Sequence, residues 1–255
     1  MILPCYVISL NNNLGPQGDA LKNSGLDPLL FNGINAKNDE HLDYLDTVST
    51  SCKNICPKSV MGIGLSHIHV TKKIYDSGVE MALILEDDAF PIVDNLNEQI
   101  IKTLSEVPDD WEIIRLHCDT HCVDGSNKIG DNSSNAAYII NRKGMEKVMS
   151  MKVNKHIDFQ YNEILNVYKS KINLFKTDEK TSLNRTKLNS FLSDILEYQY
   201  PITSGEKTWN DKLNYVIFRI PFTNIEFSQL RLLYTYLFII ICVIALLAIL
   251  KGKKH

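Results

Sequence analysis

A strand-like apolar run that ends in three carboxylates is the strongest constraint in this chain of 255 residues. Met81–Leu85 is followed directly by Glu86, Asp87 and Asp88. Charge at the end of a buried strand is costly unless something binds it, and ligands of open α/β sheets lie beyond the carboxyl ends of strands. Carboxylate oxygens suit a hard cation such as Mg²⁺ or Mn²⁺, so the run predicts a ligand-binding edge. The alternative is a solvated acidic turn.

Strand-like runs alternate with helical patterns along the first 175 residues, which predicts an α/β fold with a mostly parallel sheet. Gly78 ends the helix that contains Ile63–Ile74, and Asn141 is typical of an N-cap for a helix over Arg142–Met149. Residues 36–60 and 117–135 are polar and aperiodic, which indicates long loops. The predicted strands are Cys5–Leu10, Leu29–Asn32, Met81–Leu85, Glu112–Leu116, Ala136–Ile140 and Ile172–Phe175.

Five segments, in this order and spacing, resemble glycosyltransferase family 25, which includes lipopolysaccharide and procollagen galactosyltransferases. The segments are Cys5-Tyr-Val-Ile-Ser-Leu10, Met61-Gly-Ile-Gly-Leu-Ser-His67, Leu85-Glu-Asp-Asp88, Trp111-Glu-Ile-Ile-Arg-Leu116 and Ala137-Tyr-Ile-Ile140 with Gly144. The resemblance covers roughly residues 5 to 160. It implies a GT-A-like, Rossmann-like domain that binds a UDP-sugar and transfers a hexose, galactose above all, to a glycan or protein hydroxyl.

The resemblance implies a donor site around the acidic segment, with Mn²⁺ or Mg²⁺ as the cation that neutralises the leaving diphosphate. Asp88 is then a direct metal ligand, and Glu86 contacts the metal, its waters or the ribose. Asp87 lies beside the nucleotide. Ser9 and Leu10 would lie by the nucleotide at the end of the first strand, and Ser66 belongs to the Ser-His signature.

Two further residues, His67 and Asp158, have competing interpretations, and His156 has one. His67 is either a satisfied core histidine on the apolar face of its helix or a support for the acidic segment and donor site. Asp158 is either the carboxylate base that an inverting transferase needs or the N-cap of the helix that follows. His156 completes the predicted metal shell.

The resemblance has one departure, in the segment after the first strand. Family members carry arginines there, but this chain has Asn11-Asn-Asn-Leu-Gly-Pro-Gln17, and Lys22 is the nearest basic residue. A second hypothesis is therefore a catalytically inactive glycosyltransferase-like protein that serves as a membrane-tethered binding or scaffold protein. The sequence contains no G-x-G-x-x-G and no P-loop, which disfavours dinucleotide-dependent redox chemistry and nucleotide hydrolysis.

The C-terminal segment Leu232–Leu250 contains no charged residue and is long enough to cross a bilayer as a helix. We therefore expect four parts: the GT-A-like domain over 1–175, an extension over 176–230, a transmembrane helix over 231–251 and a basic tail over 252–255. The absence of an N-terminal signal pattern favours a cytosolic domain on a single-pass tail anchor. The lysines beyond the span favour the cytosolic side for the tail and hence a lumenal domain.

The charge balance and the cysteines leave other questions open. A net charge of −3 gives no indication of a nucleic-acid partner. Cys52, Cys56, Cys118 and Cys122 are free thiols, disulfides of a lumenal domain, or zinc ligands. High Asn and Lys usage hints at an AT-rich genome, such as that of a large DNA virus.

Overall fold

A computed structural model of the chain describes residues 3–11, 13–37, 46–120, 126–127, 132–177, 213–223 and 225–252. The chain forms two compact units. The first contains Met1–Lys53 and Lys58–Glu179, and the second contains Asn54–Pro57 and Lys180–His255.

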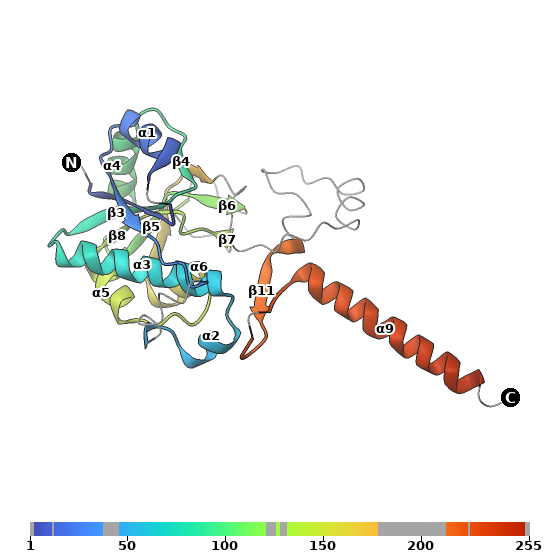
Figure 1. The fold of residues 1–255 in the computed structure, drawn as a ribbon. Helices are drawn as coiled ribbons and strands as arrows, with labels where there is room; N and C mark the ends of the chain where they lie inside the picture. The colour runs from blue at the N-terminus through green and yellow to red at the C-terminus, as the bar shows by residue number, and fades with distance from the viewer. Residues whose placement is uncertain are drawn as a thin grey trace. The chain divides into compact units, whose positions relative to one another are not determined.

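The described residues of the first unit form a six-stranded sheet in the order β2-β1-β3-β8-β5-β9 (Figure 1). Strands β2, β1 and β3 are parallel to one another, and β5 is parallel to β9. Strand β8 is antiparallel to both β3 and β5. The strands are β1 (Cys5–Ser9), β2 (Pro28–Asn32), β3 (Met81–Glu86), β5 (Ile113–Arg115), β8 (Ala137–Asn141) and β9 (Val167–Lys169). The predicted parallel-rich α/β architecture is confirmed.

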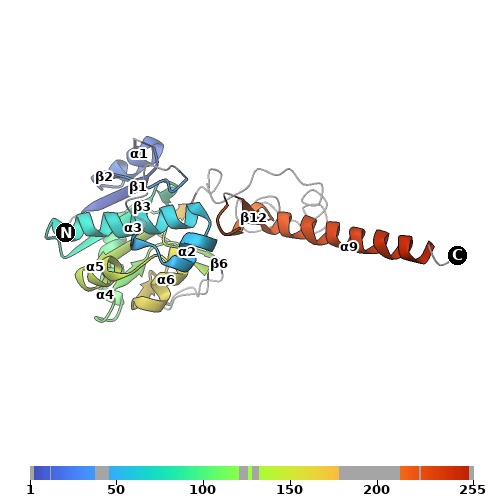
Figure 2. The same ribbon diagram turned by 60° about the horizontal axis from the view of Figure 1, so that its bottom comes forward.

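Helices cover both faces of this sheet (Figures 1 and 2). Helices α1 (Gly15–Asn23) and α4 (Leu96–Glu106) pack on one face. Helices α3 (Lys58–Asp76) and α5 (Arg142–Ser150) pack against each other on the other face. Two shorter helices are α2 (Thr50–Ile55) and α6 (Ile157–Ile164). Short strand pairs are β4 (Ala89–Pro91) with β10 (Phe175–Thr177), and β6 (Cys118–Thr120) with β7 (Asn132–Ser133).

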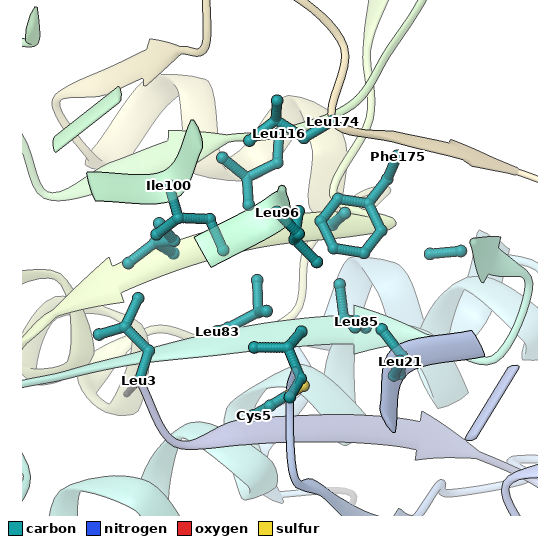
Figure 3. Close-up of a cluster of buried hydrophobic side chains, with 14 of the residues drawn as sticks. Leu3, Cys5, Leu21, Leu83, Leu85, Leu96, Ile100, Leu116, Leu174 and Phe175 are labelled. Atoms are coloured by element: carbon teal, nitrogen blue, oxygen red, sulfur yellow. The ribbon is translucent and has the colours of Figure 1, made fainter. Parts of the chain in front are cut away.

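The core on the α1 and α4 face uses alternate residues of the strands, as the two-residue period of a strand requires. Cys5 and Val7 of β1 lie there beside Leu83 and Leu85 of β3, and all four are fully buried. Figure 3 shows this cluster, to which Leu21 of α1 and Leu96 and Ile100 of α4 contribute side chains. The other alternate residues of these strands face α3 and α5, so both faces of the sheet carry apolar side chains.

Two glycines of α3 allow close packing on the second face. A Cβ atom on Gly62 would lie 2.5 Å from the backbone oxygen of Ile34, and one on Gly64 would lie 2.8 Å from Val153 Cγ1. The helix therefore approaches these neighbours closely at the turn before Ser66 and His67.

Three local predictions are wrong in part. Residues 36–60 include α2 and the start of α3, and residues 117–135 include β6 and β7. Of the strand predicted over Ile172–Phe175, only Phe175 lies in a strand, β10, and β9 was not predicted.

The second unit contains a hairpin of β11 (Val216–Arg219) and β12 (Glu226–Ser228), followed by α9 (Gln229–Gly252) (Figures 1 and 2). Residues Gln229–Leu246 of α9 have a mean hydropathy of 2.1 and are 6% buried. By length and composition this helix could span a membrane, as the segment Leu232–Leu250 predicts.

Candidate functional site

The acidic segment lies at the edge of the sheet where the parallel strands end. Strand β3 ends at Glu86, and Asp87 and Asp88 form the turn that leads into β4. Glu86 and Asp88 are two residues apart, so an extended backbone would place both on one side, but the turn begins after Glu86. Asp87 is exposed, whereas Glu86 and Asp88 are partly buried. The turn thus presents carboxylates toward solvent at the edge where α/β sheets bind ligands.

Ser9 at the end of β1 connects directly to this turn. Its hydroxyl donates a hydrogen bond of 2.7 Å to Asp87 Oδ2 and accepts one of 3.0 Å from the Asn11 backbone amide. Ser9 is buried, while the neighbouring Leu10 is 42% exposed. The two residues predicted to lie by the nucleotide therefore differ: Ser9 holds Asp87, and Leu10 presents an apolar side chain to solvent.

Gln17 of α1 holds the backbone of the same turn, and sequence reasoning missed it. Its Nε2 donates to the carbonyl oxygens of Glu86 at 2.7 Å and Ala89 at 2.6 Å, one on each side of the two aspartates. Gln17 is 1% exposed. The only sequence signal is its place four residues before the buried Leu21, on the inner face of a helix.

His67 lies on the buried face of α3 and contacts the first carboxylate. Its Nε2 lies 3.2 Å from Glu86 Oε1, and its Nδ1 lies 2.7 Å from the Tyr138 hydroxyl. A carboxylate only accepts, so a neutral ring with its hydrogen on Nε2 would donate to Glu86 and accept at Nδ1 from Tyr138. Burial raises the pKa of Tyr138 well above its usual value, so the phenol stays protonated and able to donate. His67 is both a satisfied core histidine and a contact of the acidic segment.

Ser66 lies beside His67 in the chain but contacts a different part of the fold. Its hydroxyl donates to the Gly62 carbonyl at 2.8 Å and accepts from the Ile34 amide at 2.7 Å. It is 3% exposed. Ser66 therefore ties the chain after β2 to α3, behind the edge on which the acidic turn lies.

His156 and Asp158 form a charged pair at the start of α6. The helix begins at Ile157 with His156 as its N-cap, so the interpretation of Asp158 as the cap is wrong. His156 Nδ1 lies 3.3 Å from Asp158 Oδ2 and 3.4 Å from the Asp158 amide nitrogen. These two contacts exclude each other, because a protonated Nδ1 donates to the carboxylate and a neutral Nδ1 accepts from the amide.

The pKa values favour the ion pair between these two side chains. Burial alone would lower the pKa of His156, but the carboxylates of Asp158 and Glu86 raise it. Burial alone would raise the pKa of Asp158, but His156, the Arg115 guanidinium and the Asn135 amide hold it at about 2. The effect of Glu86 on His156 links the acidic turn to the start of α6 electrostatically.

Arg115 and Asn135 complete this cluster, and sequence reasoning assigned neither of them. Arg115 Nε donates to Asn135 Oδ1 at 2.8 Å, and a second guanidinium nitrogen donates to the Asp158 carbonyl oxygen at 2.8 Å. The Asn135 amide donates to Asp158 Oδ1 at 2.8 Å. Burial lowers the pKa of Arg115 to about 10, partly offset by Asp158 and other groups, so it remains a cation at neutral pH.

A metal-binding cluster is not formed by side chains alone in the part of the chain that the structure describes. No group of three or more His, Cys, Asp or Glu side chains there is arranged to hold a metal ion. The predicted set of Asp88, Glu86 and His156 is thus not assembled as a three-ligand site. The exposed Asp87 and the partly buried Asp88 at the turn still fit a cation that takes most of its ligands from water and substrate phosphates, as Mg²⁺ usually does.

Two of the three interpretations are wrong for Cys52, Cys56 and Cys118. Cys52, Cys56 and Cys118 are disulfide-bonded, so they are neither free thiols nor zinc ligands. Cys122 and His121 lie outside the described residues. The free thiols among the described residues are Cys5, which is buried, and Cys242 in α9.

Comparison with known proteins gives only distant structural likenesses. No protein-family model matches the chain, and no curated protein matches its sequence. A197 from STIV is similar over 69% of this chain and 84% of its own, with a TM-score of 0.41 at 10% identity. A glycosyltransferase involved in the glycosylation of the major capsid of PBCV-1 covers 70% of this chain and 95% of its own, with a TM-score of 0.37 at 10% identity.

A third structure is a mutant of Drosophila beta-1,4-galactosyltransferase 7 in complex with manganese, UDP-Gal and xylobiose. It covers 84% of each chain, with a TM-score of 0.32 at 12% identity. Two of these three structures are glycosyltransferases. All three TM-scores lie below 0.5, so activity has to be argued from the residues at the sheet edge.

Proposed function

We propose that this chain is a membrane-anchored, metal-dependent glycosyltransferase of the family 25 type. It transfers a hexose, galactose first among the candidates, from a UDP-sugar to a hydroxyl of a glycan or protein with inversion. The observation that carries the proposal is the acidic turn at the carboxyl edge, where Ser9, Gln17 and His67 hold Asp87 and Glu86 from three other elements. An acidic turn fixed from three sides is preorganised for a ligand rather than simply solvated.

Asp88 and Asp87 are the proposed ligands of Mn²⁺ or Mg²⁺. Glu86 and His156 are proposed to influence the site electrostatically, because the carboxylate of Glu86 raises the pKa of His156. When bound, the cation neutralises charge on the leaving diphosphate. Ser9 orients Asp87, and His67 orients Glu86. Leu10, exposed beside Ser9, offers an apolar surface to the nucleotide, and Ser66 supports the site by fixing the chain that follows β2.

Asp158 is the proposed general base for the acceptor hydroxyl. With a pKa of about 2 it is ionised at neutral pH, and it is only weakly basic. The acceptor hydroxyl becomes acidic as its bond to the anomeric carbon forms, so a weakly basic carboxylate in hydrogen-bond reach can take the proton. His156 and the Asn135 amide fix the orientation of Asp158.

The proposed anchor is α9, with the first unit on the oxidising side of the membrane. Disulfide bonds at Cys52, Cys56 and Cys118 persist in the endoplasmic reticulum lumen or outside the cell and are rare in the cytosol. Lys251, Lys253 and Lys254 beyond the span favour the cytosolic side for the C-terminal tail. Both observations favour a lumenal first unit over a cytosolic one.

A second candidate function is a binding or scaffold protein that has lost catalysis. The segment Asn11–Gln17 has no basic residue, and the two cations at the ends of β5 and β9, Arg115 and Lys169, are buried. Such a protein would bind a nucleotide-sugar or a glycan without turnover.

A donor screen distinguishes the two functions. The full chain in detergent is incubated with each UDP-sugar, Mn²⁺ and a set of glycan and peptide acceptors, and released UDP is measured. The transferase requires acceptor-dependent UDP release that chelation with EDTA abolishes. Saturable UDP binding by calorimetry without release from any donor would favour the scaffold, and absence of both would contradict the glycosyltransferase assignment.

A further inference from the structure

The tip of the β11–β12 hairpin places a bulky aromatic residue where a turn favours glycine. The Thr223 amide donates to the Ile220 carbonyl at 3.2 Å, which closes a four-residue turn with Pro221 second and Phe222 third. Phe222 has a φ of +63°. Proline second and a positive φ third are the features of a type II turn, whose third position favours glycine or asparagine. A bulky residue with positive φ is uncommon and marks strain that the fold tolerates for a reason outside the turn.

Hydrogen bonds hold this turn firmly around Phe222. The Ile220 amide donates to the Ile225 carbonyl at 3.0 Å, and the Thr223 hydroxyl donates to the Ile220 carbonyl at 3.0 Å. The Ile225 amide donates to the Thr223 hydroxyl at 3.1 Å. The phenyl ring itself is 93% exposed, so packing within the described residues does not compensate for its backbone conformation.

Other exposed apolar side chains lie on the same hairpin. Ile225 is 50% exposed, Ile217 is 46% exposed and Tyr215, just before β11, is 39% exposed. The tip sequence Ile220–Ile225 contains no charged residue. An uncharged hairpin tip with an aromatic residue at its apex is an unfavourable surface to leave in water.

The hairpin continues directly into the apolar helix. Strand β12 ends at Ser228, and α9 begins at Gln229. Arg231 of α9 donates to the Glu226 carbonyl of β12 at 2.6 Å, which fixes the hairpin to the first turn of the helix. The neighbouring Leu230 is fully buried. Figure 1 shows β11 and α9 as parts of one connected unit.

We propose that the hairpin tip inserts into the headgroup and upper acyl region of the bilayer that α9 crosses, with Phe222 as its anchor. Aromatic side chains are favoured at this depth, and the exposed apolar side chains of Phe222 and Ile225 gain free energy by leaving water there. A lipid surface is the occupant because Phe222 is seven residues along the chain from Gln229, where the apolar helix begins. The inference rests on the proposed membrane anchoring but not on sugar transfer. It gives the second unit two contacts with the membrane, one spanning and one interfacial.

Tryptophan fluorescence in brominated vesicles tests this inference in the full chain. Phe222→Trp and Ile241→Trp are reconstituted separately into phosphatidylcholine vesicles brominated either near the headgroups or near the bilayer centre. The parent chain contains Trp111 and Trp209, so its emission is subtracted from that of each variant to give the emission of the added tryptophan. We expect Phe222→Trp to lose most of this emission with shallow bromines and little with deep ones. Ile241→Trp, within α9, should show the reverse.

A third variant controls for adsorption of the first unit. Ile172 is 54% exposed in that unit, and Ile172→Trp should keep its emission in both kinds of vesicle. Quenching at Ile241→Trp but not at Phe222→Trp overturns the hairpin contact and leaves the anchor intact. Absence of quenching at both positions overturns the anchor together with the inference. A blue-shifted but unquenched Phe222→Trp shows that protein, either the first unit or a second copy, covers the tip, and this too overturns the lipid contact.

Discussion

Gln17 of α1 donates a hydrogen bond from its side-chain amide to the backbone carbonyl of Glu86. The same amide nitrogen donates to the carbonyl of Ala89, on the far side of the acidic turn. Gln17→Glu keeps the size of the side chain but replaces the donor by an oxygen that repels both carbonyls. Partners that orient metal ligands typically change metal affinity by about 10–100-fold when removed. We therefore expect the Mn²⁺ dissociation constant, measured by calorimetry in the presence of UDP, to rise about tenfold or more.

Asn141→Asp is the matched control for this substitution. Asn141 also donates from a side-chain amide to a backbone carbonyl, that of Trp111, but it lies at the opposite end of β3, paired with Met81. The aspartate keeps the acceptor that caps α5 and loses the donor. Its Mn²⁺ affinity should match that of the parent chain, and an equal loss of affinity in both variants would mean that Gln17 acts through general stability.

Asp88→Asn tests the proposed metal ligand. Loss of a carboxylate that binds the cation removes stabilisation of the leaving diphosphate, worth several kcal/mol, so acceptor-dependent UDP release should fall below detection. Circular dichroism should be unchanged. Asp94→Asn, an exposed carboxylate in the loop before α4, should release UDP at the parent rate. Mn²⁺-dependent turnover of Asp88→Asn at the parent rate would remove Asp88 from the site.

Replacement of His67 should separate stability from donor binding. His67→Leu removes the hydrogen bond between Nδ1 and the fully buried Tyr138 hydroxyl, which costs about 1–3 kcal/mol of unfolding free energy, and it releases Glu86. The double variant with Tyr138→Phe removes this hydroxyl as well and should recover part of the stability. It should not recover the KM for the UDP-sugar. Recovery of both would show that His67 is a core residue without influence on the donor site.

Asp158→Asn distinguishes a catalytic from an organising carboxylate. A positioned base contributes about 10² or more to turnover, so kcat should fall by that factor while UDP affinity changes little. Collapse of UDP affinity would instead place Asp158 with the donor site. A parent-like kcat would leave Asp158 as an organiser of His156 and Asn135.

The pH dependence of stability should show the ion pair of His156 and Asp158. Asp158 has a folded pKa of about 2 against 3.8 unfolded, so its contribution is present above pH 3.8 and is lost as the pH falls toward about 2. This difference corresponds to roughly 2 kcal/mol. The pKa of His156 is raised from 6.5, so its contribution is present below pH 6.5 and is lost as the pH rises through the folded value. Unfolding in urea from pH 2 to 8 should show Asp158→Asn with a flatter profile below pH 4.

Local patterns with a strong physical cause were predictable from the sequence. Met81–Leu85 is apolar throughout because both faces of β3 are covered, and Asn141 caps α5 by accepting from the Gly144 amide. Strand β9 was missed because Val167–Lys169 is three residues long and is defined by its pairing with β5, more than fifty residues earlier. A pairing at such a separation leaves no periodic signal in a short segment.

The site was predictable only where the residue type itself suggests chemistry. Carboxylates that follow a buried strand predict a ligand site, and a histidine in a family signature predicts a role at that site. Gln17 was missed because it acts on backbone carbonyls, which every residue has. Arg115 and Asn135 were missed because strand β8 runs against its neighbours, so its beginning reaches the edge at which β5 ends.

The buried thiol of Cys5 has a consequence for the handling of this protein. Burial, with a smaller effect of Asp27, raises its pKa to about 12, so almost no thiolate is present at neutral pH. Thiolate is the species that attacks disulfides, and exchange therefore cannot begin at this position. Cys5 will therefore not exchange with the cross-links at Cys52, Cys56 and Cys118 during purification and storage, which leaves Cys242 of α9 as the other free thiol among the described residues.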